Sequence, residues 1–181
     1  MLSFEPARPR FLRFAVSMAV CGLLALSGCQ VRPLYATGPA GAGNAALTQP
    51  ISINEVTSRY AQEVRNHLIF ALNGGAGEPA GAAYKLELGV TKRVTTVATI
   101  TPPTGESRPS AGAVVLASNY VISDAVTDSQ VATGTREVTA SFDRPSQQFA
   151  QLRAERDAED RAARELAEAL KLAIAADLAN R

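Results

Sequence analysis

The sequence has no tryptophan, one histidine and two cysteines, and charged residues make up only 19% of its 181 positions. A Ser-His-Asp triad would have to use the single histidine, His67, and metal sites built from several histidines or cysteines are excluded. Lys and Arg number 18 against 17 Asp and Glu, which gives a formal net charge of +1. A chain so evenly balanced lacks the basic field that is typical of nucleic-acid binders. The composition therefore argues against most enzymes and against a nucleic-acid partner.

Residues 1–28 have the pattern of a secretory signal peptide. Arg8, Arg10 and Arg13 stand against one acid, Glu5, and residues 14–26 are almost wholly apolar. A basic segment followed by about 13 apolar residues is typical of an export signal. It is shorter than the roughly 20 residues that a transmembrane helix needs.

The segment Leu26-Ser27-Gly28-Cys29 has the lipobox pattern of bacterial lipoproteins. In this pattern the Cys29 thiol takes a diacylglyceryl group, and cleavage then leaves Cys29 as the lipidated N-terminus. Cys21 does not fit, because Val20 stands where a small residue is required. Several acyl chains on one residue give a stable membrane anchor. Gln30, in place of an Asp after the lipidated cysteine, favours the outer membrane.

The rest of the chain divides into a tether and one domain. Residues 29–50 are rich in Gly, Ala, Pro and Thr, which is typical of a flexible tether, and residues 51–181 carry the domain. Alternating and helical periodicities predict a strand at 51–56, a helix from Thr57 or Ser58 to Asn73, strands at 84–100, 114–125 and 131–142, and a helix at 147–179. Residues 101–112, with two prolines near their start, are predicted to form an exposed loop.

The predicted order is β-α-β-β-β-α, which indicates an α+β fold. Two amphipathic helices on one face of a four-stranded mixed sheet make a two-layer sandwich. The other face of the sheet is rich in Thr and Ser, so it faces either solvent or a polar partner. The last helix has a thin apolar stripe in its first half. We therefore expect its start to be more exposed than its second half, which covers the sheet.

Two adjacent cations, Lys92 and Arg93, interrupt a strand that is otherwise rich in Thr and Val. Neighbouring basic groups can hold phosphates, and Arg can do so in a bidentate manner. The alternative is a pair of solvated charges that protects a sheet edge. Arg136 on a later strand joins this cluster only if the strand register allows it.

Other pairs of titratable residues are weaker candidates. Glu63 and His67 stand four residues apart on a predicted helix, but two ligands do not make a metal site. Asp124 and Asp128 flank a predicted turn, where Asp commonly bonds the local backbone. We therefore predict no catalytic residues, no metal and no cofactor.

Taken together, the lipobox and these elements resemble the LptE family of lipopolysaccharide-assembly lipoproteins, in its alphaproteobacterial form. The segments that carry the resemblance are Cys29-Gln-Val-Arg-Pro-Leu-Tyr35, Arg59–Leu68, Tyr84–Leu88, Ala117–Asp124, Ser141-Phe142 and Asp157–Leu170. One departure is Val31, where the family often has Phe. Each motif is short, and the resemblance to the family depends on their order and spacing over nearly the whole mature chain.

The resemblance implies a lipid-anchored protein on the periplasmic face of the outer membrane. It implies insertion as a plug into an LptD-type β-barrel, assistance in assembling that barrel, and transport of lipopolysaccharide to the outer leaflet, without enzymatic activity. Because lipid A carries phosphates, Lys92 and Arg93 become candidate lipopolysaccharide contacts. The alternatives are an auxiliary lipoprotein of another, ABC-type lipid-transport system and an outer-membrane lipoprotein enzyme.

Overall fold

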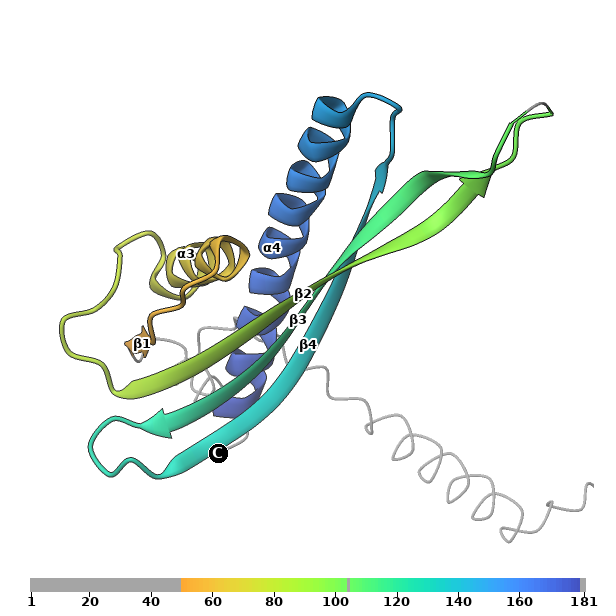
Figure 1. Cartoon of the computed structure of the whole chain (residues 1–181). Coiled ribbons are helices and arrows are strands. Elements are labelled where there is room, and N and C mark those ends of the chain that lie inside the picture. The colour runs from red at the N-terminus through yellow and green to blue at the C-terminus, as the bar shows by residue number, and fades with distance from the viewer. Residues whose placement is uncertain (1–49, 104, 180–181) are drawn as a thin grey trace, which may run out of the picture. The chain divides into compact units, whose positions relative to one another are not determined.

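The structure, a computed structural model, describes residues 50–103 and 105–179. The elements in these residues are β1 (Ile51–Ile53), α3 (Arg59–Asn73), β2 (Tyr84–Ile100), β3 (Arg108–Asp124), β4 (Gln130–Asp143) and α4 (Gln148–Ala179) (Figure 1). The predicted order β-α-β-β-β-α is confirmed. The predicted signal peptide, Cys29 and the tether as far as residue 49 lie outside the described residues.

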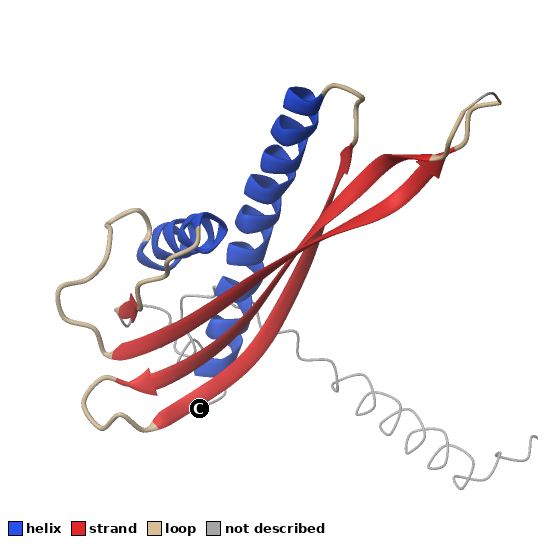
Figure 2. Ribbon diagram, viewed as in Figure 1, coloured by secondary structure: helices blue, strands red, loops and turns tan. Residues whose placement is uncertain are grey.

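The four strands form one mixed sheet in the order β1-β2-β3-β4 (Figure 2). β1 runs parallel to β2, and the crossover between them is α3, as parallel neighbours require. β2, β3 and β4 are joined by antiparallel hairpins in which Leu88 lies opposite Tyr120 and Tyr120 lies opposite Gly134. This register places the even-numbered residues of β2, β3 and β4 on one face over most of the sheet.

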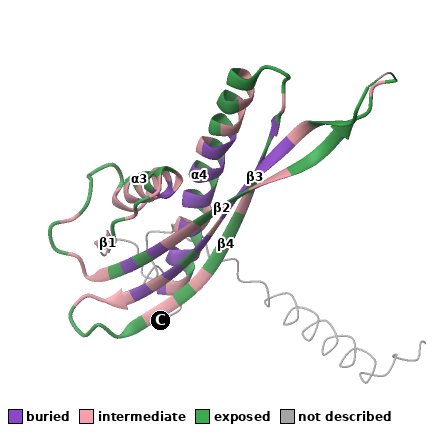
Figure 3. Cartoon of the chain, in the orientation of Figure 1, coloured by how far each residue is buried: buried purple, intermediate pink, exposed green. Residues whose placement is uncertain are grey.

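That face packs against the two helices and forms the core. Its largest buried side chains, shared between the sheet and the helices, are Val64, Leu68, Leu86, Val114, Leu116, Tyr120, Ile122, Leu166, Leu170 and Ile174. Burial runs along β3 and along the inner side of α4, while much of β4 is exposed (Figure 3). The predicted two-layer α+β sandwich is therefore what the chain forms.

The first helix begins and ends where its sequence indicates. Ser58 is the N-cap and has an extended backbone, although its side chain makes no capping hydrogen bond. Asn73 is the last helical residue, and Gly74 follows with φ 57°, a left-handed conformation that glycine adopts without steric cost. Its N–H bonds back to the Phe70 carbonyl.

The last helix is exposed at its start and buried further along, as predicted. Phe149 is 85% exposed and Leu152 is 48% exposed, whereas continuous burial begins with Ala158 and Glu159. No helix in the described part of the chain is both long and apolar enough to cross a bilayer.

The first strand is shorter than the predicted 51–56 and ends at Ile53. Beyond it, Asn54 still donates its N–H to the Leu86 carbonyl at 3.1 Å. Its side-chain oxygen then accepts the Leu88 N–H at 2.7 Å. A side chain therefore takes the place of the next backbone partner, and the chain turns toward α3.

The prediction of an exposed loop over residues 101–112 is wrong for residues 108–112, which belong to β3. Pro109 is tolerated because pairing with β4 ends at Ala111 and Asp143, so β3 has a strand on one side only at that point. Gly112 is required for space: a Cβ there would lie 2.7 Å from the Phe142 ring. Proline and glycine are unfavourable inside most strands, but both residues are accommodated in this hairpin.

Candidate functional site

The two predicted cations, Lys92 and Arg93, lie on opposite faces of the sheet. Successive side chains of a strand point to opposite faces. Lys92 lies opposite Leu116, on the face that packs against the helices, and Arg93 lies opposite Val115 on the open face. The pair therefore does not converge on one phosphate.

Lys92 is held in an ion-pair network with the helices. Its Nζ lies 2.8 Å from Glu159 Oε2, and Glu159 also accepts a bond from Arg59 at 2.6 Å. The Lys92 ammonium lies 5.8 Å from the centre of the Tyr60 ring. The hydrogen bond to Glu159 raises the pKa of Lys92, and a bond to Asp160 raises the pKa of Arg59. Because Arg59 lies on α3, Glu159 on α4 and Lys92 on β2, this network joins the three elements. The side chain of Glu159, at its centre, is only 7% exposed.

Arg93 is exposed and makes no ion pair or side-chain hydrogen bond with any residue that the structure describes. Arg136 does not join it, because Arg136 lies opposite Ser118 on the helix-facing side of the sheet. Its guanidinium donates to the Thr135 carbonyl at 2.6 Å. The register thus decides against the three-residue basic cluster.

The open face around Arg93 is polar at its sides and small in its centre. Exposed threonines line it on β2 and β4: Thr91, Thr133, Thr135 and Thr139. Ala117 lies between Thr91 and Glu137. A shallow hollow of about 260 Å³ lies here, lined by Thr91, Thr135, Asn119 and Glu137 among others. Such a face offers hydrogen-bonding groups without a large apolar surface.

A second group of cations gathers where the β2–β3 hairpin approaches the start of α4. Arg108 and Arg144 line a cavity of about 400 Å³ together with Ile100, Pro109, Ser110, Pro145, Ser146 and Gln151. None of these residues carries a carboxylate. Arg144 Nε is fully buried and has no hydrogen-bond partner in the described structure. Two guanidinium groups in a lining that contains no acidic residue make this cavity suited to an anion.

This cavity is not evident from the sequence, because Arg108 falls inside the predicted loop. Arg144 immediately follows the last strand and precedes Pro145, so its place in the sequence indicates only the end of a strand. Nothing local indicated that a residue of the first hairpin and one from the start of the last helical segment would lie together. That proximity follows from the register of β3 against β4.

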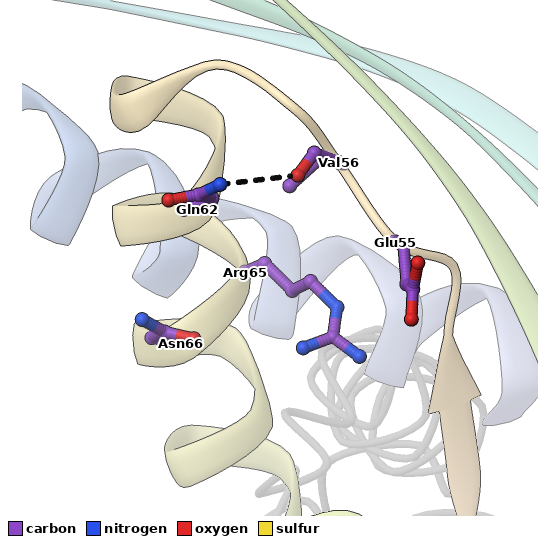
Figure 4. Close-up of a pocket in the computed structure, with 5 residues that line it drawn as sticks. All are labelled: Glu55, Val56, Gln62, Arg65 and Asn66. Carbon is purple, nitrogen blue, oxygen red and sulfur yellow. Dashed lines mark hydrogen bonds between the residues drawn. The ribbon is translucent and has the colours of Figure 1, made fainter.

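Another hollow lies between the β1–α3 segment and α3, and its arginine is paired within the protein (Figure 4). Arg65 reaches across it and donates to the carbonyls of Ile53 and Asn54 at 3.0 and 2.9 Å. It also forms an ion pair with Glu78 at 2.7 Å. This arginine therefore ties the helix to the end of β1.

The weaker candidates from the sequence have structural roles or none. Asp124 accepts the backbone N–H groups of Val126 and Thr127, both at 3.0 Å, as turn aspartates do. Asp128 forms an ion pair with Lys85 at 2.8 Å. Within residues 50–103 and 105–179, no three His, Cys, Asp or Glu side chains gather that could hold a metal ion.

Comparison with known proteins gives matches of two kinds. The model of the LptE family, described as lipopolysaccharide-assembly, matches residues 48–174. The fold is similar to that of a lipoprotein from Caulobacter crescentus CB15, with 26% identity and a TM-score of 0.61 over 80% of this chain and 100% of that chain. A minor lipoprotein from Acinetobacter baumannii shares the fold, with 12% identity and a TM-score of 0.51 over 70% of this chain and 89% of that one. No curated protein matches.

Proposed function

The chain belongs to the LptE family of lipopolysaccharide-assembly lipoproteins, a non-enzymatic family, and on that basis we propose that it plugs an LptD-type outer-membrane β-barrel and serves lipopolysaccharide transport to the outer leaflet. The observation that carries the proposal is the family match itself, because residues 48–174 include nearly all of the described fold.

The open face of the sheet is the surface that suits a barrel lumen. The inside of an outer-membrane barrel is polar. A face with Thr91, Thr133, Thr135 and Thr139 can exchange hydrogen bonds with such a wall without burying a large apolar area. Arg93 adds to this face one cation that has no ion-pair partner among the described residues.

Two places are proposed as contacts for the phosphates of lipopolysaccharide. Lys92 and Arg93 were the sequence-based candidates. Arg93 retains that role because it is exposed, whereas the Lys92 ammonium is already paired with Glu159. The cavity between Arg108 and Arg144 is the stronger of the two, since none of its lining residues is acidic and Arg144 Nε has no hydrogen-bond partner among the described residues.

The anchor is proposed to be acyl chains on Cys29, which hold the domain at the periplasmic face of the outer membrane. Replacing Cys29 by serine removes the thiol that accepts the lipid. We expect the Cys29→Ser protein to leave the membrane fraction, as measured by fractionation of the cell envelope. A variant that stays with the outer membrane and lacks acyl chains by mass spectrometry would contradict this anchor.

The partner is tested by affinity purification of the tagged protein from detergent-solubilised outer membrane, followed by mass spectrometry. We expect an LptD-type barrel in a stoichiometric amount. Recovery of inner-membrane transporter subunits in its place would favour an auxiliary lipoprotein of an ABC-type lipid-transport system.

Lipopolysaccharide binding is tested on the same preparation with single variants. We expect Arg144→Ala to weaken binding more than Arg93→Ala, with barrel recovery unchanged in both. Lys92→Ala serves as a comparison, because it removes an ion-paired cation, and we expect its main effect on stability. Full binding by a protein lacking both Arg93 and Arg144 would refute both proposed contacts.

A further inference from the structure

Arg144 is fixed at its backbone just beyond the end of β4. Its N–H donates to the Ser110 carbonyl at 2.8 Å, which extends the pairing of β3 and β4 by one residue. The carbon at the centre of its guanidinium lies 5.5 Å from the centre of the Phe142 ring. The side chain thus lies back over the hairpin, and an aromatic face supports it on one side.

Gly112, on β3, provides the space in which this guanidinium lies. A Cβ at this position would be 2.7 Å from Arg144 Nε and 2.7 Å from Phe142 Cζ. Gly112 is not among the glycines with a positive φ, so what it supplies is room rather than backbone freedom. Phe142 is only 6% exposed and packs in the core, so the ring cannot retreat easily. A methyl group at residue 112 would therefore displace the Arg144 guanidinium from its place over the hairpin.

This arrangement leaves the Arg144 guanidinium partly withdrawn from water. Its Nε is fully buried and has no hydrogen-bond partner in the described structure. A buried donor without a partner costs free energy, and such cases need an explanation. Burial of Nε fixes the plane of the guanidinium, and Arg144 also lines the cavity. The several acceptor oxygens of a phosphate group can pair with such a planar guanidinium.

We propose that Gly112 and Phe142 are positioning residues that hold Arg144 over the hairpin, where its guanidinium lines the cavity and binds a phosphate monoester. The proposal rests on the anion-binding role given above to the cavity of Arg108 and Arg144. It adds the reason why Arg144 is available: Gly112 makes the room, Phe142 supplies the aromatic surface, and Ser110 fixes the backbone.

The test follows the Arg144 Nε–H directly by ¹⁵N NMR of the detergent-solubilised lipoprotein, with Arg144→Lys to assign the signal. Inorganic phosphate and purified lipid A are the two probes, and lipid A without its phosphates is the matched ligand control. In the wild-type protein we expect a slowly exchanging Nε–H signal that shifts with phosphate and with lipid A. A shift with lipid A at far lower concentration than with phosphate identifies a lipid headgroup as the source. The reverse order identifies free phosphate.

Gly112→Ala is the main variant. We expect its Nε–H to exchange rapidly with water and its affinity for both probes to fall at least tenfold. Gly89→Ala is the matched control on the neighbouring strand. The atoms nearest to a new Cβ there belong to the side chain of exposed Asn119, which can move away, so this variant should behave as wild type. Phe142→Leu keeps an apolar residue in the core but removes the ring. It should weaken binding even if Gly112→Ala does not fold.

The outcomes separate the two levels of the proposal. A wild-type signal that responds to neither probe would refute the anion-binding role, and the positioning role with it. A wild-type response that Gly112→Ala and Phe142→Leu keep at full affinity, with slow Nε–H exchange, would refute the positioning role alone.

Discussion

Replacing Gly134 by alanine is expected to destabilise the protein through a single contact. Gly134 lies on β4 directly opposite Tyr120 on β3. A Cβ at this position would lie 2.5 Å from the Tyr120 hydroxyl oxygen, 2.7 Å from Cζ and 2.9 Å from Cε1. The glycine backbone is not in a positive-φ conformation, so alanine meets no backbone strain. Any loss of stability must come from the ring.

The ring has little freedom to move away. Tyr120 is 1% exposed, and its hydroxyl donates to Asp177 of α4 at 2.6 Å. Forcing extra volume into such a site typically costs about 1–3 kcal/mol. We expect a loss of about 2 kcal/mol for Gly134→Ala, which corresponds to a fall of roughly 8 °C in Tm for a domain of this size.

The assay is a double-mutant cycle by urea unfolding, with Tyr120→Leu as the second change. Leucine lacks the distal ring atoms that the new methyl group would meet. In the Tyr120→Leu background, Gly134→Ala should therefore be nearly neutral or slightly stabilising, because alanine limits the unfolded chain more than glycine does. An equal loss in both backgrounds would refute the steric explanation.

Three other perturbations have clear expected results. Burial and the bond to Asp177 raise the pKa of Tyr120 to about 12, so the folded protein holds this proton more tightly than the unfolded chain. The stability that this proton contributes is complete below about pH 10 and falls toward pH 12. In urea unfolding across this range, the Tyr120→Phe protein should therefore show a smaller loss of stability than the wild type. Glu159→Gln should lower the free energy of unfolding by about 2 kcal/mol, because it leaves the partly buried Lys92 without its closest carboxylate. Asp157→Asn breaks an exposed ion pair and should lower it by at most about 0.5 kcal/mol in the same denaturation assay. Gly74→Ala should lower stability by about 1–2 kcal/mol, since φ 57° is unfavourable for alanine, and an unchanged Tm would contradict the C-cap assignment.

The fold was predictable from sequence because its main signals are local. The alternation from Tyr84 to Val90 and the helical spacing that ends at Asn73-Gly74 need no knowledge of the rest of the chain. Each signal held in the structure, within a few residues. The family resemblance rested on the same kind of evidence, since it used short motifs in a fixed order.

The hairpin boundary was not predictable by the same means. Pro109 and Gly112 are breakers in isolation, and both are accommodated by tertiary contacts. The proline lies beyond the end of β4, and the glycine faces a ring and a guanidinium from residues 142 and 144. Strand propensity is set largely by such neighbours, so local patterns alone place the start of β3 too late, at residue 114 instead of Arg108.

The ion-pair partners of the candidate site residues could not be predicted from local sequence patterns. Adjacency in sequence suggested that Lys92 and Arg93 act together, yet on a strand adjacency places side chains on opposite faces, and that much follows from the period of two alone. Whether Lys92 is available to a ligand depends on Glu159, which is 67 residues away in the sequence. Glu159 lies in a helix that contains many acidic residues, so the sequence does not single it out. The same holds for Arg108 and Arg144, which the register of β3 and β4 brings to one cavity. A cation's availability to a ligand is set by the carboxylates within reach, and for both groups those are decided by topology.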